Sequence, residues 1–117
     1  MSEIMKRISQ IGIVPVVVLE DAEKAVSVAK SLAAGGIDCA EVTFRTAAAE
    51  ESIRRIAAEC PDLLLGAGTV LTTEQVEKAV NAGAKFIVTP GYNPKVVNYY
   101  TMYREIDASF LGSYIAE

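Results

Sequence analysis

The sequence CAEVTFRT, from Cys39 to Thr46, is the stretch that decides the expected fold. It begins with an apolar run suited to a strand, and three similar runs recur at intervals of roughly 25 residues. These runs are Ile13–Leu19, Leu63–Ala67 and Phe86–Thr89. A helical pattern follows each run, which predicts four βα units of a parallel α/β protein.

Local signals mark where the helices between these strands begin and end. Gly35-Gly36 and Pro61 are expected to end the first two helices. Pro15 cannot donate to a strand ladder, so the first strand should be an edge strand or irregular. Residues 1–10 are expected to form a short amphipathic segment that packs against the residues that follow it. The expected start signals are Asp21, Thr46, Thr72 with Gln75, and Asn93 before Pro94.

Length and composition limit the architecture. The chain has 117 residues, which predicts a single domain over 1–117 and is far below the roughly 250 residues of a complete (β/α)₈ barrel. We therefore expect a half-barrel, with an open doubly wound sheet as the alternative that strand order would decide. A hydrophobic fraction of 51% and a mean hydropathy of +0.29 predict self-association.

Charge and residue types argue against several classes of partner and site. The net charge of −4 without a basic cluster disfavours nucleic acid, and no apolar run is long enough for a membrane span or a signal peptide. We expect a cytoplasmic protein. Without histidine, Cys39 and Cys60 cannot complete a metal site and are expected to be buried thiols.

Side chains alternate along a strand, so CAEVTFRT separates polar from apolar residues. Glu41, Thr43 and Arg45 share one face, and apolar side chains occupy the other. The apolar face would pack under helices, which leaves the polar face inside a barrel, near the carboxyl ends of the strands where barrel enzymes have their sites. A buried glutamate needs a partner or a task, so Glu41 is a candidate acid–base residue. A structural ion pair between Glu41 and Arg45 is the alternative.

Two further strand ends are expected at the same rim. Gly66-Ala67-Gly68-Thr69 has small residues that would let a ligand approach the backbone, and Thr69 can donate to an oxygen. A simple tight turn is the alternative, since this is not a dinucleotide motif. Thr89-Pro90-Gly91 ends the fourth strand, so three adjacent strand ends should converge.

Four of these segments, in this order and spacing, resemble one family. IVPVV at 13–17, EVTFRT at 41–46, GAGTV at 66–70 and VTPG at 88–91 are similar to the amino-terminal half of 2-keto-3-deoxy-6-phosphogluconate (KDPG) aldolase, which also acts as 4-hydroxy-2-oxoglutarate (KHG) aldolase. The resemblance covers about residues 8–98 and leaves 99–117 as a divergent, helical tail.

The resemblance implies a (β/α)₈ barrel, usually a homotrimer, that reversibly cleaves a 2-keto-3-deoxy acid to pyruvate and an aldehyde through a Schiff base. It implies no metal and no cofactor. Glu41 matches the general acid/base, Arg45 the residue that grips the pyruvyl carboxylate, Thr69 a hydroxyl contact to the same end, and Pro90 a residue of the pocket wall.

The chain also departs from the family pattern. The nucleophilic lysine of the family is on strand six, beyond residue 117, and the short fifth strand expected after Asn98 is missing. Lys85 precedes Phe86 and echoes the lysine motif, but it is expected at the amino end of its strand, the wrong end of a barrel. We therefore expect this chain to lack lyase activity alone.

Two functions remain open from the sequence. The first is an aldolase half-barrel that takes a 2-keto acid such as pyruvate and pairs with another copy or with a complementing half. The second is a non-catalytic, truncated or engineered scaffold subunit that assembles through residues 99–117. That tail either covers exposed core or binds a partner as a helix.

Overall fold

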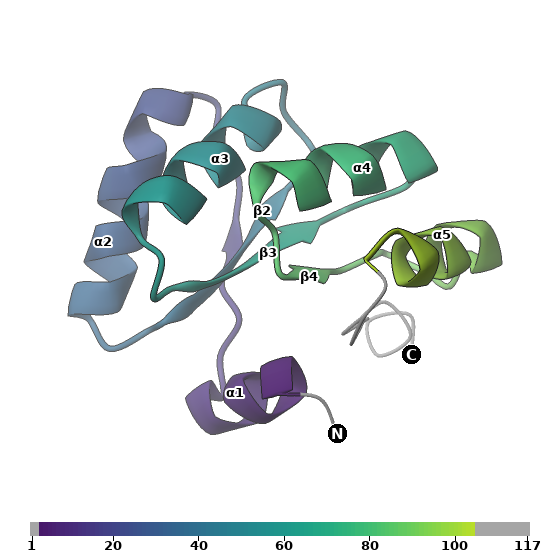
Figure 1. The fold of residues 1–117 in the computed structure, drawn as a ribbon. Coiled ribbons are helices and arrows are strands. Elements are labelled where there is room, and N and C mark those ends of the chain that lie inside the picture. Colours follow the sequence, from purple (N-terminus) through teal and green to yellow (C-terminus); the bar gives the residue numbers. More distant parts are fainter. Residues whose placement is uncertain (1–2, 105–117) are drawn as a thin grey trace.

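The computed structural model describes residues 3–104, in which helices and strands alternate along the chain (Figure 1). The predicted role of residues 105–117 as a covering or partner-binding helix therefore lies outside the described residues. The helices are α1 (Glu3–Ile11), the 3₁₀ helix η1 (Ala22–Lys24), α2 (Ala25–Ala34), α3 (Ala49–Glu59), α4 (Thr73–Ala82) and α5 (Pro94–Arg104). The strands are β1 (Val16–Val17), β2 (Cys39–Thr43), β3 (Leu64–Gly68) and β4 (Phe86–Ile87).

The four strands form one sheet in the order β1-β2-β3-β4, and every pair is parallel. In the longest ladder Glu41 lies opposite Gly66, and Thr43 lies opposite Gly68. A doubly wound sheet requires the strand order to reverse at some point, and this sheet has no reversal among its four strands. The chain is thus four βα units of a barrel-type fold, as predicted.

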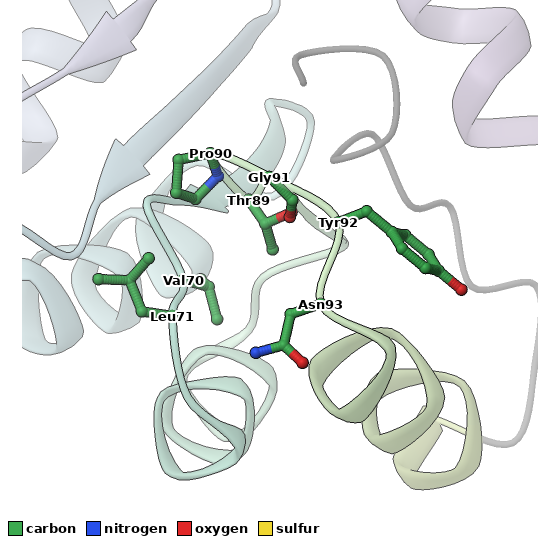
Figure 2. A pocket seen from close by; sticks show the side chains of 7 residues that line it. All are labelled: Val70, Leu71, Thr89, Pro90, Gly91, Tyr92 and Asn93. Carbon is green, nitrogen blue, oxygen red and sulfur yellow. The ribbon is translucent and has the colours of Figure 1, made fainter. Parts of the chain in front are cut away.

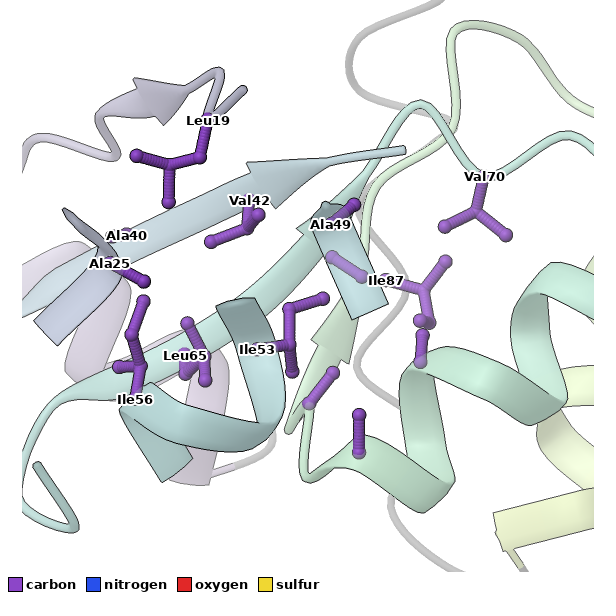
Figure 3. Close-up of a cluster of buried hydrophobic side chains, with 14 of the residues drawn as sticks. Leu19, Ala25, Ala40, Val42, Ala49, Ile53, Ile56, Leu65, Val70 and Ile87 are labelled. Atoms are coloured by element: carbon purple, nitrogen blue, oxygen red, sulfur yellow. The ribbon is translucent and has the colours of Figure 1, made fainter. Parts of the chain in front are cut away.

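Helices α2, α3 and α4 cover one face of the sheet (Figure 1). The apolar side chains of that face meet the helices in the main core, where Val42 and Leu65 from the strands pack near Ile53 from α3 (Figure 3). All three are buried. Removing such side chains from water is the main contribution that holds the strands and helices together.

The opposite face of the sheet, here called the inner face, carries the residues of the other strand parity. Helix α1 covers this face near the amino ends of the strands, as predicted from the amphipathic pattern of residues 1–10. The inner face comprises Cys39, Glu41, Thr43, Leu64, Gly66, Gly68, Phe86 and Val88. A second apolar cluster forms where Ile4, Met5, Ile8 and Ile11 of α1 pack against Cys39, Leu64, Phe86 and Val88.

Strand β1 differs from its prediction. The apolar run covers Ile13–Leu19, but only Val16–Val17 is regular strand, and Val16 and Val18 are 57% and 47% exposed. The expectation from Pro15 is confirmed, because β1 is the edge strand. Pro15 has no N–H to donate, and it joins the sheet through its carbonyl, which accepts from Glu41 N–H at 2.9 Å.

Three of the four predicted helix starts are confirmed by side-chain caps. Asp21 accepts from Glu23 N–H, Thr72 Oγ1 accepts from Gln75 N–H, and Asn93 Oδ1 accepts from Lys95 N–H. The prediction for Thr46 is wrong. Its hydroxyl donates to the carbonyl of Leu19 at 2.5 Å, and α3 begins at Ala49 without a side-chain cap. This hydrogen bond therefore connects the loop that follows β2 to the loop that follows β1.

The helices of residues 3–104 are all too short or too polar to cross a lipid bilayer.

Candidate active site

The polar side chains of β2 lie on the inner face, as the alternation predicts. Glu41 is 6% exposed and Thr43 is buried, while their neighbours Ala40 and Val42 belong to the main core on the other face. The Thr43 hydroxyl donates to the carbonyl of Val17 at 3.4 Å, which ties β2 to the edge strand. Glu41 is therefore an acid held inside the fold rather than on its surface.

Burial raises the pKa of the Glu41 carboxyl above its ordinary value, and the positive charge of Arg45 lowers it by a smaller amount. The buried Oε2 atom accepts no hydrogen bond from any residue in the described part of the chain. A carboxylate without donors is poorly stabilised away from water, so the proton is held more tightly by Glu41 than by a surface glutamate. Such a group can donate a proton at a pH where a surface glutamate could not.

Arg45 and Thr69 come together where β2 and β3 end. Arg45 Nε donates to Thr69 Oγ1 at 3.3 Å, and the rest of the guanidinium is exposed. Thr69 has a φ of +53°, a left-handed conformation that is unusual for a β-branched residue. Strained backbone of this kind is concentrated at functional sites.

The alternative of a structural ion pair between Glu41 and Arg45 is not what the geometry shows. Within residues 3–104 the salt bridges do not include this pair, and Arg45 bonds to Thr69 instead. The two charges influence one another only at longer range. The carboxyl and the guanidinium are thus separately available.

The glycines of β3 play a different part from the expected one. The sequence suggested room for a ligand against the backbone, but the aromatic ring of Phe86 fills the side-chain space of Gly66, and the carboxyl of Glu41 fills that of Gly68. The turn alternative is also wrong, because both glycines lie within the strand. Sequence reasoning missed this packing, although glycines at alternate positions opposite a glutamate were the available signal.

Pro90 is exposed and lines a hollow of about 250 Å³ between the loops that follow β3 and β4 (Figure 2). The hollow is lined by Val70, Leu71, Thr89, Pro90, Gly91, Tyr92 and Asn93. A bond from Val70 N–H to the carbonyl of Val88 at 3.3 Å holds the two loops together. The strand ends therefore converge as predicted, but the hollow that Pro90 lines is not lined by Glu41, Arg45 or Thr69.

None of the lysine side chains, which all belong to the described part of the chain, is buried. All six are exposed: Lys6, Lys24, Lys30, Lys78, Lys85 and Lys95. Lys85 directly precedes β4, at the amino end of the strand, as predicted. The six ammonium groups therefore belong to residues in contact with water.

The cysteines differ from one another. Burial raises the pKa of the Cys39 thiol to about 11, which agrees with the predicted inert thiol. Cys60 is only half-buried, so the same prediction is too strong for it. No cluster of acidic or thiol side chains suited to a metal ion occurs in the part of the chain that the structure describes.

Comparison with known proteins shows the family of the chain. The family model described as KDPG and KHG aldolase matches residues 4–107. The chain belongs to the KDPG and KHG aldolase family. A 2-dehydro-3-deoxy-phosphogluconate aldolase of Treponema pallidum is 54% identical over 97 residues, which are 83% of this chain and 46% of that protein. A Haemophilus influenzae protein of the same name is 47% identical over 95 residues, 81% of this chain and 45% of its own length.

A solved member of the aldolase family has the same fold. The structure of KDPG aldolase from Legionella pneumophila, with pyruvate captured as a covalent carbinolamine intermediate, matches with a TM-score of 0.74 and 35% identity. The match covers 83% of this chain and 46% of that one. The chain spans about half the length of the curated aldolases it matches. The family model crosses residue 98, where the divergent tail was expected to begin, and that boundary remains a prediction.

Proposed function

We propose that this chain supplies the acid–base and carboxylate-binding part of an aldolase site that cleaves a 2-keto-3-deoxy acid, with or without a 6-phosphate, reversibly to pyruvate and an aldehyde. The observation that carries the proposal is the buried carboxyl of Glu41 on the inner face, whose Oε2 atom accepts no hydrogen bond from the described residues, near the strand ends where Arg45 bonds to Thr69. Family membership supports the same reaction class.

Each residue has a role that suits its surroundings. Glu41 would give and take protons, because burial holds its pKa above the ordinary range for a carboxyl. Arg45 would bind the pyruvyl carboxylate through its exposed guanidinium nitrogens, whose fork matches two oxygens. Thr69 would donate its hydroxyl to the same end of the substrate, and Pro90 would form an outer wall.

The proposed reaction runs through a Schiff base. A lysine amine adds to the keto carbon, and water leaves to give an iminium ion. The C3–C4 bond then breaks while the C4 hydroxyl loses its proton, and the bonding electrons form an enamine that is protonated at carbon. Hydrolysis releases pyruvate and the free lysine. Glu41 would carry the protons at these steps.

We propose that these 117 residues do not supply that lysine and have no lyase activity alone. The support is the exposure of all six lysines. Borohydride reduction in the presence of labelled pyruvate tests this directly. We expect no covalent adduct on the isolated chain, and an adduct mapped by mass spectrometry to any of the six lysines would overturn the proposal.

Pyruvate binding tests the carboxylate site separately from the chemistry. Titration of the ¹⁵N-labelled chain with pyruvate should shift the amides around Arg45 and Thr69, and Arg45→Leu should weaken binding at least about tenfold, or 1.4 kcal/mol. Arg55→Leu, on the outer helix α3, is the matched control and should bind as the unmodified chain does. Equal binding by Arg45→Leu and Arg55→Leu would contradict the proposal.

The partner implied by this reading is a second copy of the chain or a complementing half-barrel. The support is the edge strand β1, where Val16 and Val18 are exposed beside unpaired backbone groups. A second candidate function, a non-catalytic scaffold subunit, is favoured by exposed Tyr92 and Met102 around α5. Truncation after Arg104 keeps helix α5 and its buried Tyr100, and it discriminates between the two because only the scaffold needs the rest of the tail to assemble.

A further inference from the structure

The position of the Glu41 carboxyl is determined by the space that the glycines of the neighbouring strand β3 leave free. Glu41 and Phe86 flank Gly66 in the sheet register, one from each side. A Cβ at position 66 would lie 2.5 Å from Phe86 Cδ2, so the aromatic ring already fills the space above that glycine. The Glu41 side chain cannot lie sideways across the same position.

The remaining space on β3 is above Gly68, two residues further toward the strand ends. A Cβ at position 68 would lie 2.9 Å from Glu41 Cδ and still closer to Oε2, which real Cβ atoms essentially never do. Thr43 Cγ2 is 3.4 Å from the same point and closes the space from the β2 side. The missing side chain of Gly68 is therefore the space that the carboxyl group occupies.

We propose that Gly68 is a positioning residue for Glu41: its lack of a side chain holds the carboxyl group down against β3, in a buried space closed by Thr43 and beside the ring of Phe86. The catalytic meaning of this position rests on the function proposed above. The packing itself does not, because it can be measured without any substrate.

The position controls how readily Glu41 ionises. The charged or titratable groups near it are the Arg45 guanidinium, which favours the carboxylate, and the buried thiol of Cys39. Burial outweighs the effect of Arg45. A side chain at position 68 would push the carboxyl out of the buried space into water, so the main cause of its raised pKa would be lost.

The test is Gly68→Ala in the 117-residue chain. The Glu41 carboxyl is followed by ¹³C NMR with labelled glutamate, and its resonance is assigned by its loss in Glu41→Gln. We expect the pKa of Glu41 in Gly68→Ala to fall toward the ordinary value of 4.5. A folded Gly68→Ala chain in which the pKa of Glu41 is unchanged would overturn the proposal.

Gly66→Ala is the matched control, because it adds the same methyl group to the same face of the same strand. It displaces Phe86 rather than Glu41, so it should lower stability while the Glu41 pKa stays raised. Gly91→Ala, which meets nothing within 4 Å, should change neither quantity. An equal fall of the Glu41 pKa in Gly66→Ala and Gly68→Ala would mean general loosening, and would refute a specific role for Gly68.

A double-mutant cycle keeps the proposal testable if Gly68→Ala folds poorly. In the Glu41→Ala background the space above position 68 is vacant, so the added methyl group should be tolerated and the loss of urea midpoint seen with Gly68→Ala alone should disappear. An equal loss of urea midpoint from Gly68→Ala in the unmodified chain and in Glu41→Ala would contradict the proposal. Neither readout involves pyruvate, so a chain that fails to bind pyruvate would refute the proposed function and leave the role of Gly68 standing.

Discussion

Three residues of the candidate site lie in three different environments. Glu41 is buried, Thr69 is half-buried, and Arg45 is exposed at the strand ends. Water around Arg45 keeps its guanidinium free to meet an incoming carboxylate, whereas the lack of water around Glu41 alters its acidity. In the proposed function, binding and proton transfer therefore belong to separate side chains, Arg45 and Glu41, which lie just after β2 and within it.

Glu41 should make the stability of the chain depend on pH. Its pKa is raised by folding, so the folded state holds the proton more tightly than the unfolded state. The resulting stability is fully present below the unfolded pKa of about 4.5 and is lost as pH rises through the higher folded pKa.

We expect Glu41→Gln to flatten this fall in the free energy of unfolding, because the amide cannot ionise. Urea denaturation at a series of pH values between 4 and 8 measures it. The exposed Glu20→Gln is the matched control and should follow the unmodified chain. A Glu41→Gln profile that still falls as steeply would show that another group is responsible.

Thr69 should contribute more to pyruvate binding than to the free energy of unfolding. We expect Thr69→Gly to leave the free energy of unfolding unchanged or raise it by up to about 1 kcal/mol, because relief of left-handed strain offsets the flexibility of glycine. Pyruvate affinity should fall, since Arg45 loses its hydroxyl partner. Chemical denaturation and pyruvate titration of the same sample measure both; a large loss of stability with unchanged affinity would contradict this.

At the scale of elements, the helices differ in whether a side chain satisfies their first N–H groups. Helix α4 is the clearest case, since Thr72 accepts from Gln75 N–H and the Gln75 side chain accepts from Leu71 N–H. Its end is equally defined, because Gly83 has a φ of +117° and stops the helix. Helix α3 lacks such a cap and depends on packing through residues such as Ile53.

Removing the α4 cap should therefore be measurable. We expect Thr72→Ala to lower the free energy of unfolding by about 1 kcal/mol, because the Gln75 N–H loses its acceptor. Thr73→Ala makes the same chemical change one residue further on, at an exposed helical position, and should change stability by less than about 0.5 kcal/mol. Equal losses in the two variants would rule out the cap as the cause.

At the scale of the whole molecule, one face of the sheet is covered by helices, while within residues 3–104 the edge strand β1 has a neighbouring strand on one side only. The outer face is covered by α2, α3 and α4, and α1 covers the amino end of the inner face (Figure 1). Strand β1 keeps Val16 and Val18 exposed along the edge of the sheet. Exposed apolar edges of this kind pair with other strands.

We expect the chain to associate in solution through this edge. Val18→Lys places a charge on it and should raise the dissociation constant at least about tenfold, or 1.4 kcal/mol. Leu71→Lys changes a similarly exposed apolar residue in the loop after β3 and should associate normally. Analytical ultracentrifugation over a concentration series measures both, and a monomeric unmodified chain at high concentration would contradict the prediction.

The periodicity of apolar residues was enough to predict the four βα units, and alternation within CAEVTFRT was enough to put Glu41 on the inner face. These are local properties, in which each residue dictates the direction of its neighbours. The role of Thr46 and the short length of β1 escaped the same reasoning, although Pro15 had predicted the edge position of β1. The hydroxyl of Thr46 is used by a carbonyl 27 residues earlier in the chain, and β1 is short because of its edge position.

The sequence by itself determined the order of strands and helices, the family and the residue types available for chemistry, because these follow from patterns along the chain. Only the tertiary structure decided that the glycines of β3 make room for Phe86 and Glu41, and that Arg45 bonds to Thr69 rather than to Glu41. Those outcomes depend on which atoms of separate strands compete for the same space, and no single stretch of the chain contains that information.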